Sequence, residues 1–345
     1  CGMSPRLHPA AAAVGVVAAV PTRSPLHILL AKAPMEQVDF RAMGSDMRGV
    51  LDAPWKPARE ALIQLPTWFE TWEQCMSRFR ADSELNQLNA QAGMPVPVSQ
   101  DLMDVIMASL EAAKATEGLV DPTLKDAMLA IGYDRSFEKL SSGSSDISSG
   151  PEHAITNNGA GWWDIRCDPE LGLVHLPAGV HLDLGGIGKG WAADRAVERL
   201  RVQGPALVDA GGDIAVNEPP HRSQGWPIAV TDPRNPDGEP LAILKIVQGG
   251  VATSGRDFRR WTHDGVPQHH ILDPQTRQPA ETDVLAATVI APSALEAEAA
   301  AKAVLIQGGR RGMAWLESRP QLAGLLVAED GSMSVSLNLD SHLWS

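Results

Sequence analysis

A glycine-rich stretch at the centre of the chain, residues 181–194, constrains the fold more than any other segment. It reads HLDLGGIGKGWAAD, with glycines on both sides of Lys189, and a helical pattern follows at once. Backbone N–H groups and one ammonium group therefore meet at a helix N-terminus, where phosphates and other anions bind. It is not a P-loop, because Asp183 stands where that motif has Gly and Gly190 where it has Ser or Thr. Trp191 likewise breaks the Rossmann fingerprint, so a phosphate site and a plain strand-to-helix turn both remain open.

The composition narrows the classes of protein. With 345 residues, 44% of them hydrophobic, the chain can bury a large core in one big domain or two. A formal net charge of −13 argues against nucleic acid or an anionic membrane as a partner. Cys1, Cys75 and Cys167 form no C-x-x-C pair, so we expect inert thiols and neither structural zinc nor a disulfide framework.

The N-terminal segment, residues 1–34, is predicted to be a mobile leader or signal-like segment that precedes a domain over residues 35–345. Its first residues, Cys1 and Gly2, would suit a lipid-anchored mature lipoprotein. The apolar run Ala10–Val20 instead resembles a signal-peptide core, and it is too short to span a membrane. A lipid anchor at Cys1 is thus left open, as are a cytoplasmic and a cell-envelope location, and no transmembrane segment is expected.

Hydrophobic periodicity predicts an α+β fold rather than a doubly wound sheet, since strands with antiparallel character are mixed with segregated helices. Two strands are expected within Val38–Leu51, and an amphipathic helix over Leu62–Phe79 with an irregularity at Pro66. Ser99 and Ser293 precede further helical patterns, the second running to Ile306. Other expectations are strands at 172–176, 180–184, 226–230, 241–247 and 258–261, a tight turn at 251–255, and a surface loop without chemistry at 141–150.

Three further places carry groups capable of chemistry. A buried strand ends in two glycines between Asp209 and Asp213, which indicates a close approach by a ligand or by another strand. His270 precedes a short apolar run with Asp273 three residues on, the arrangement of a general base beside a carboxylate or of a structural histidine. Glu298 and Lys302 lie four apart in a helix, where an ordinary ion pair is the simplest interpretation.

Taken in order, these segments resemble one family, the ApbE-type FAD:protein FMN transferases, from about Val38 to Ile306. The matching segments are Met43-Gly44-Ser45, Ser77-Arg78-Phe79, Asp82-Ser83-Glu84-Leu85, Thr116-Glu117-Gly118, Asp121-Pro122-Thr123, residues 183–194, Gly211-Gly212-Asp213, Thr253-Ser254-Gly255 and residues 270–274. The resemblance implies an ApbE-like fold of mostly antiparallel sheets with flanking helices. It also implies binding of FAD and transfer of its FMN half to a Ser or Thr hydroxyl of a target protein, with release of AMP and usually with magnesium.

The same resemblance implies roles for individual residues. His270 would be the base, oriented by Asp273, and Lys189 with the amides after Gly185 would face the pyrophosphate. The positions that would line the FAD pocket are Met43, Ser83, Gly118, Asp183, Gly186, Gly188, Asp209 and Ser254.

The late helix departs from the family's pattern. Typical members have Asp and, four residues on, Thr, which hold magnesium together with a backbone carbonyl that corresponds to Gly188. Here these positions are Glu298 and Lys302, and an ammonium group cannot ligate a metal and repels one. We therefore expect Lys302 to occupy the magnesium position, paired with Glu298 and close to the Gly188 carbonyl, which puts Gly188 and Glu298 in question as metal ligands.

A second departure is Arg277, which stands where the family has Gly and would add positive charge near the phosphates. Two alternatives to the transferase follow from these departures. One is an FAD-binding protein without transferase activity, and the other is an FAD pyrophosphatase that uses water as the acceptor.

Overall fold

The computed structural model describes residues 25–29, 35–137, 140 and 159–344. The predicted loop at 141–150, Cys1 and most of the predicted leader lie outside these residues. The predicted α+β class with antiparallel sheets is confirmed. The two cysteines within these ranges, Cys75 and Cys167, are free thiols as expected.

An eight-stranded sheet forms the centre of the described structure, in the order β18-β17-β16-β11-β8-β7-β3-β2, with every neighbouring pair antiparallel. Its strands are β2 (Glu36–Ala42), β3 (Ser45–Leu51), β7 (Ala206–Ala210), β8 (Asp213–Val216), β11 (Gly249–Gly255), β16 (Val284–Ala291), β17 (Ala323–Ala328) and β18 (Met333–Val335). Successive residues alternate between its faces, as Leu207 and Val208 do in separate apolar clusters. Both faces are therefore covered.

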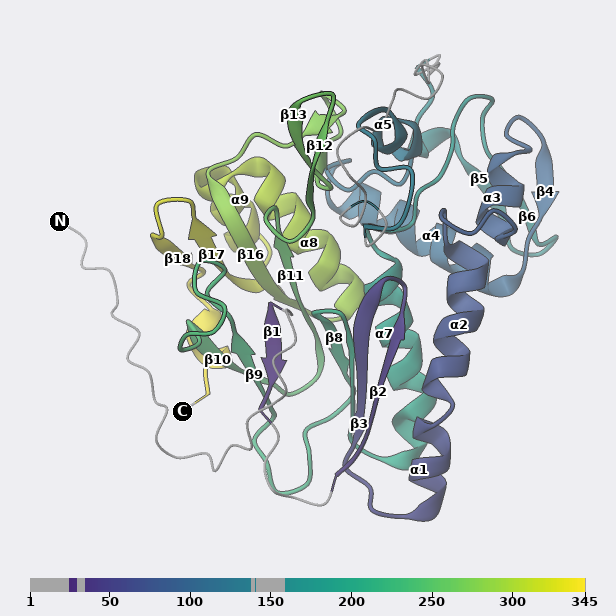
Figure 1. Cartoon of the computed structure of the whole chain (residues 1–345). Coiled ribbons are helices and arrows are strands. Elements are labelled where there is room, and N and C mark those ends of the chain that lie inside the picture. The colour runs from purple at the N-terminus through teal and green to yellow at the C-terminus, as the bar shows by residue number, and fades with distance from the viewer. Residues whose placement is uncertain (1–24, 30–34, 138–139, 141–158, 345) are drawn as a thin grey trace.

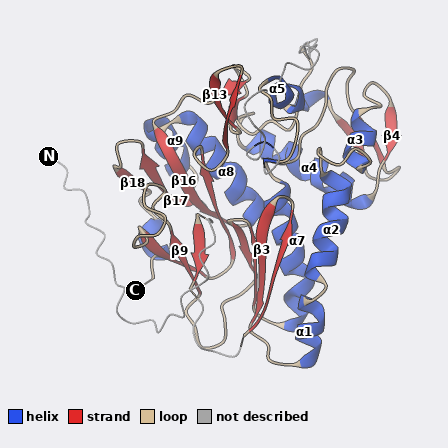
Figure 2. Cartoon of the chain, viewed as in Figure 1, coloured by secondary structure: helices blue, strands red, loops and turns tan. Residues whose placement is uncertain are grey.

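Helices cover one face of this sheet, and a small second sheet covers the other (Figure 1 and Figure 2). On the helical face lie α7 (Gly188–Leu200), α8 (Ala294–Gln307) and α9 (Gly309–Glu317). The second sheet consists of β1 (Leu26–Ile28), β9 (Trp226–Val230) and β10 (Ala242–Ile246). Burial on both sides explains why β16 is apolar at nearly every position.

Strand β1 falls inside the range predicted to be a leader. Leu26 and Ile28 are 1% and 4% exposed, and β1 pairs with β9 along its whole length. The ordered fold thus includes at least these residues, because their apolar side chains complete the second core.

The remaining helices and strands surround the central layers. They are α1 (Lys56–Leu62), α2 (Leu65–Met76), α3 (Glu84–Asn89), α4 (Gln100–Ala115), α5 (Lys125–Ala130), β4 (Pro95–Pro97), β5 (Arg166–Asp168), β6 (Leu173–His175), β12 (Arg260–His263), β13 (Val266–His269), β14 (Leu272–Asp273) and β15 (Gln278–Pro279). The hairpin β12–β13 rises beyond one end of the central sheet, on the same side as α5 (Figure 1).

The predicted irregularity at Pro66 is a complete break. Helix α1 ends at Leu62 and α2 begins at Leu65, with Pro66 in the first turn, where a missing N–H costs no hydrogen bond. Helix α2 then packs on α7 through Trp72 and Trp191, whose rings meet edge to face with centroids 5.6 Å apart. This contact places the C-terminal end of α2 beside the start of α7.

Three local predictions are wrong. Residues 251–255 are not a turn but part of β11, whose Gly250 lets α8 approach so closely that a Cβ there would lie 2.3 Å from the Ala294 nitrogen. Residues 180–184 form no strand, since the Asn89 amide satisfies both the N–H and the carbonyl of Leu182 at 2.7 and 2.9 Å. The strand expected at 258–261 begins later, at Arg260, because the chain turns through Phe258.

Other predictions are confirmed. Ser99 caps α4 and Ser293 caps α8, each accepting a hydrogen bond from a backbone N–H three residues on. Among the described residues, no helix combines the length and the apolar character that crossing a membrane requires.

Candidate functional site

The loop at 183–187 is fixed at both ends before it enters α7. Leu182 and Leu184 are buried, and the N–H of Asp183 donates to the Pro122 carbonyl at 2.8 Å. The Asp183 carboxylate accepts from the Gly185 N–H at 2.8 Å and pairs with Arg78, Nε to Oδ2 2.9 Å. The loop is thus held without a strand, and the helix begins at Gly188.

Two cavities are lined by residues of this loop. The larger, of about 280 Å³, is lined by Met43, Phe79, Tyr133 and Lys189 among others. The smaller, of about 70 Å³, is lined by Asp121, Gly186, His270 and Lys302 among others. Asp183 borders both cavities, so the glycine-rich loop is the wall between them.

Two lysines and two carboxylates form a connected cluster behind the loop. Lys189 pairs with Asp213 of β8 and lies 3.9 Å from Glu298 Oε1. The same Glu298 Oε1 accepts from Lys302 Nζ at 2.9 Å, which confirms the predicted i,i+4 pair in α8. Burial alone would lower the pKa of Lys189, but Asp213 and Glu298 outweigh it and raise that pKa, so Lys189 is an ammonium group.

Glu298 is also tied to the backbone at the start of α7. Its side chain is 1% exposed, and Oε2 accepts from the Gly190 N–H at 2.9 Å. Gly190 permits this contact, because a Cβ there would lie 2.7 Å from the Ala294 carbonyl oxygen of α8. The close crossing of α7 and α8 therefore positions the cluster.

His270 borders the smaller cavity with an uncommitted nitrogen. Its Nδ1 is buried and has no hydrogen-bond partner among the residues described. Burial, together with the nearby Arg259, Lys302, His269 and Lys189, lowers the pKa of His270 well below its usual 6.5. The imidazole is thus neutral near pH 7 and has a lone pair available for a proton.

Asp273 bonds within its own turn rather than to the imidazole. Its Oδ1 accepts from the Gln275 N–H at 2.8 Å, and no hydrogen bond joins it to His270 in the described part of the chain. The orientation of His270 by Asp273 stays a prediction. In the same turn Arg277 adopts a φ of +58°, a conformation that favours glycine, and it acts electrostatically on Asp121 of the smaller cavity.

The structure brings most of the predicted loop residues to the two cavities. Met43, Asp183, Gly188 and Lys189 line the larger cavity. Gly186 and His270 line the smaller one, and a Cβ on Gly186 would lie 3.9 Å from Lys302 Cε. A Cβ on Gly188 would lie 2.8 Å from Met76 Sδ, so the Met76 side chain would have to move to admit one.

Four other predicted pocket residues do not line either cavity. Ser83 is fully buried and caps α3 by accepting from the Asn86 N–H at 3.1 Å. Gly118 ends α4 with a φ of +83°, and Ser254 is buried on β11. Asp209 accepts from the Gly212 N–H at 2.7 Å, and burial raises the pKa of Asp209 to about 7. Their predicted contacts with FAD stay predictions.

The larger cavity is also lined by three residues that were not predicted to belong to the site, Arg78, Tyr133 and Arg259. The Arg78 guanidinium lies 4.1 Å from the centroid of the Phe79 ring and 4.5 Å from that of Tyr133. Its Nη2 is buried without a hydrogen-bond partner in the described residues. In the sequence, Arg78 could have been recognised as a site residue because it belongs to the polar run that follows the buried face of α2.

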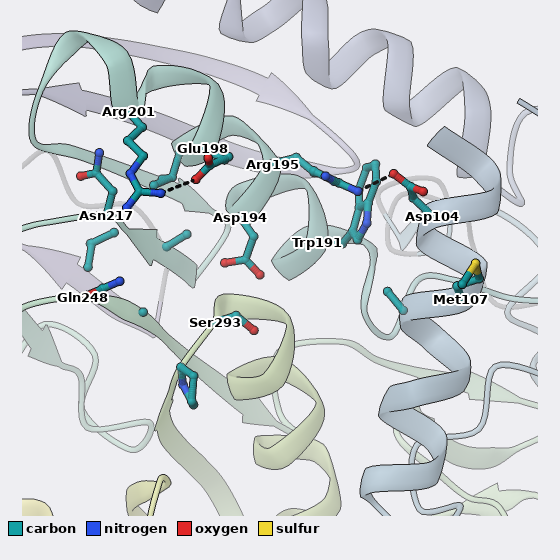
Figure 3. A pocket seen from close by; sticks show the side chains of 16 residues that line it. Asp104, Met107, Trp191, Asp194, Arg195, Glu198, Arg201, Asn217, Gln248 and Ser293 are labelled. Carbon is teal, nitrogen blue, oxygen red and sulfur yellow. Dashed lines mark hydrogen bonds and ion pairs between the residues drawn. The ribbon is translucent and has the colours of Figure 1, made fainter. Parts of the chain in front are cut away.

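A cavity more voluminous than these two lies elsewhere, along α7 and near the start of α8 (Figure 3). It measures about 560 Å³, but its charged side chains satisfy one another, as in the pairs Arg195–Asp104 and Arg201–Glu198. Asp194 caps α8 by accepting from the N–H groups of Ala294 and Leu295. Size therefore does not make this cavity the candidate site.

The carboxylates near the loop do not fit a divalent cation. Both oxygens of Glu298 are engaged, one by Lys302 and one by the Gly190 N–H, and Asp213 is paired with Lys189. Within the described ranges, no group of three or more His, Cys, Asp or Glu side chains could hold a metal ion. The donor set thus disagrees with the magnesium site that the resemblance implies.

Comparison with known proteins connects the chain to one family. Residues 43–326 match the ApbE family. A FAD:protein FMN transferase of Treponema pallidum is 31% identical over 304 residues, which are 82% of this chain and 82% of that protein. Another, of Salmonella typhimurium, is 26% identical over 87% of this chain and 86% of that protein.

Solved structures agree with this match. The ApbE protein of Thermotoga maritima superposes with a TM-score of 0.79 at 27% identity, covering 90% of this chain and 100% of that one. The flavin transferase ApbE of Vibrio cholerae has a TM-score of 0.72 at 26% identity, with coverage of 90% and 100%.

Proposed function

This chain belongs to the ApbE family, and we propose that it transfers the FMN half of FAD to a Ser or Thr hydroxyl of a target protein. The observation that carries the proposal is His270. His270 lines the same small cavity as Lys302 and Gly186, and its buried Nδ1 has no hydrogen-bond partner among the described residues. A neutral base beside a fixed cation is what the transfer of a phosphoryl-type group to a hydroxyl requires.

Different residues of the site have different roles in the reaction. The acceptor hydroxyl oxygen attacks the phosphorus on the FMN side of the pyrophosphate, and His270 takes the hydroxyl proton. The bond from that phosphorus to the bridging oxygen breaks, and AMP leaves with the electron pair. Lys189 and Lys302 neutralise the charge that develops on the phosphate oxygens. The larger cavity, with Phe79 and Tyr133, supplies aromatic surface for a ring system of FAD.

The proposal is tested by incubating the full chain with FAD and a library of peptides that each carry one Ser or Thr. We expect peptides heavier by one FMN, detected by mass spectrometry, and one AMP released for each, measured by chromatography. Free FMN with AMP and unmodified peptides would instead identify an FAD pyrophosphatase. FAD that is bound but unchanged would identify a binding protein without transferase activity, the alternative that Lys302 favours.

A matched pair of variants assigns the base. His270→Ala should abolish AMP release and leave FAD binding, measured by flavin fluorescence, within about threefold. His269→Ala removes the neighbouring imidazole, which bonds with the Ala280 carbonyl instead of facing the small cavity. It should retain transfer.

A further inference from the structure

One buried carboxylate oxygen lies between two ammonium groups in this site. Glu298 Oε1 is 2.9 Å from Lys302 Nζ and 3.9 Å from Lys189 Nζ. Lys189 has a second carboxylate partner in Asp213. Glu298 and Asp213 therefore hold both ammonium groups in fixed positions.

The two ammonium groups belong to residues that line different cavities beside the glycine-rich loop. Lys189 lines the larger cavity, and Lys302 lines the smaller one beside Gly186 and His270. The side chains of Lys189 and Lys302 are 18% and 17% exposed, so each can still be reached by an anion. Each of the two cavities therefore has its own fixed cation.

A pyrophosphate diester carries one negative charge on each of its two phosphates. A divalent cation would normally bridge such a pair, but the engaged oxygens of Glu298 and Asp213 leave no donor set for one. Lys302 also repels a metal ion by Coulomb interaction at short range. The cation that the site needs is thus part of the chain.

We propose that this chain binds the pyrophosphate of FAD without a divalent metal ion, with the ammonium groups of Lys189 and Lys302 each contacting one phosphate. This inference rests on the proposed function for the identity of the ligand. Glu298 holds both ammonium groups in place and is itself held by the Gly190 N–H. The outcome is a site whose charge does not depend on the concentration of magnesium.

The test is FAD binding rather than turnover. FAD is titrated into the full chain in the presence of EDTA and again with excess magnesium chloride, and flavin fluorescence is followed. We expect dissociation constants that agree within about twofold. Binding that is about tenfold or more tighter with magnesium would overturn the inference. So would calorimetric binding of magnesium to the FAD-loaded protein that Glu298→Gln removes.

Variants of Lys302 make the test sharper. Lys302→Met should weaken FAD binding about tenfold or more in either buffer, because it removes a charge from the phosphate site. Lys302→Thr frees Glu298 and adds a hydroxyl, so it should bind FAD weakly in EDTA and regain affinity with magnesium. Lys302→Arg keeps the charge and should stay closest to the original chain. Equal affinity of all three variants would contradict the assigned role.

The chain offers a matched control for the loss of an i,i+4 lysine. Lys56 and Glu60 form an exposed pair of the same spacing, with Nζ 3.5 Å from Oε1. Lys56→Met should leave FAD binding unchanged, and thermal melting of each variant confirms that it is folded. Absence of FAD binding in both buffers would overturn this inference and the proposed function together. Metal-independent binding without any transfer would overturn only the proposed function.

Discussion

Arg78 and Asp183 form a buried ion pair beside the larger cavity, with Nε 2.9 Å from Oδ2. Their side chains are only 5% and 10% exposed. Arg78 follows the last turn of α2, and Asp183 lies two residues before Gly185, the first glycine of the loop. The pair therefore connects the end of α2 to the wall between the two cavities.

Arg78→Ala should be strongly destabilising. It leaves the Asp183 carboxylate buried without its cation, which costs about 3–5 kcal/mol in comparable buried pairs. The free energy of unfolding, measured by urea denaturation at pH 7.5, should fall by that amount. As a matched control, Arg201→Ala breaks a pair whose side chains are 60% and 67% exposed, and it should change stability by about 0.5 kcal/mol or less. Similar losses in the two variants would contradict the importance of burial.

The pH dependence of transfer should follow His270. Burial, the cations Arg259, Lys302 and Lys189, and the neighbouring His269 lower the pKa of His270 well below 6.5. The base is therefore unprotonated above that pH, and the acidic limb of kcat/KM for AMP release should lie below pH 6.5. Arg259→Met removes the cation with the largest such effect and should shift the limb to higher pH. An acidic limb centred above pH 7 in the original chain would exclude a His270 with a lowered pKa as the base.

Asp209 makes the stability of the fold depend on pH. Burial, opposed by the Gly212 hydrogen bond, raises the pKa of Asp209 to about 7 from its ordinary value of 3.8. Between these values the folded chain keeps a proton that the unfolded chain has lost, so stability falls as pH rises through this window. Above the folded pKa the contribution of Asp209 no longer changes.

Asp209→Asn isolates this contribution. The amide keeps an oxygen for the Gly212 N–H but does not titrate. Urea unfolding at pH 5, 6, 7 and 8 should show the free energy of unfolding of the variant rising relative to the original chain by about 2–4 kcal/mol across the window. Asp194, whose pKa burial raises to about 6, is present in both proteins and cancels in the difference. If the free energies of unfolding of the variant and of the original chain changed in parallel with pH, the raised pKa of Asp209 would be contradicted.

Much of the fold was predictable because the patterns are local. The capping serines Ser99 and Ser293 and the break near Pro66 are read directly from residue type and spacing. The prediction of a turn at residues 251–255 was wrong because small polar residues are typical of turns. These residues belong to a central strand, where the closeness of α8 explains why the strand residues are small. Leu182 was misread because its backbone partners come from Asn89, which is distant in the sequence.

The candidate site was predictable to the extent that it is one contiguous stretch with neighbours in a known order. Lys189 and His270 were first identified from their local residue patterns, Gly186 from the resemblance, and Lys302 from its departure from the family's pattern. Arg259 and Tyr133 were missed, because their place at the larger cavity depends on how distant segments pack. Ser83 was named for the pocket and is instead a buried helix cap, a role that its position before α3 also fits.

Gly190 should tolerate no side chain, whereas Gly186 should accept one. A Cβ on Gly190 would lie 2.7 Å from the Ala294 oxygen and 2.8 Å from the Leu295 Cα, both of them backbone atoms of α8. On Gly186 the nearest atom is the flexible end of Lys302 at 3.9 Å. Both glycines belong to the same stretch, so comparing variants at the two positions separates the effect of the crossing of α7 and α8 from the effect of the loop.

The expected difference is large. Gly190→Ala forces α7 and α8 apart and loosens the hydrogen bond from the Gly190 N–H to Glu298, which should cost about 2–4 kcal/mol in urea denaturation. It should also weaken FAD binding, since Glu298 positions Lys189 and Lys302. Gly186→Ala should stay within about 1 kcal/mol of the original stability, so any loss of FAD binding in that variant reports on the loop itself. If Gly190→Ala were as stable as Gly186→Ala, the close crossing of the two helices would not be what holds the charged cluster in place.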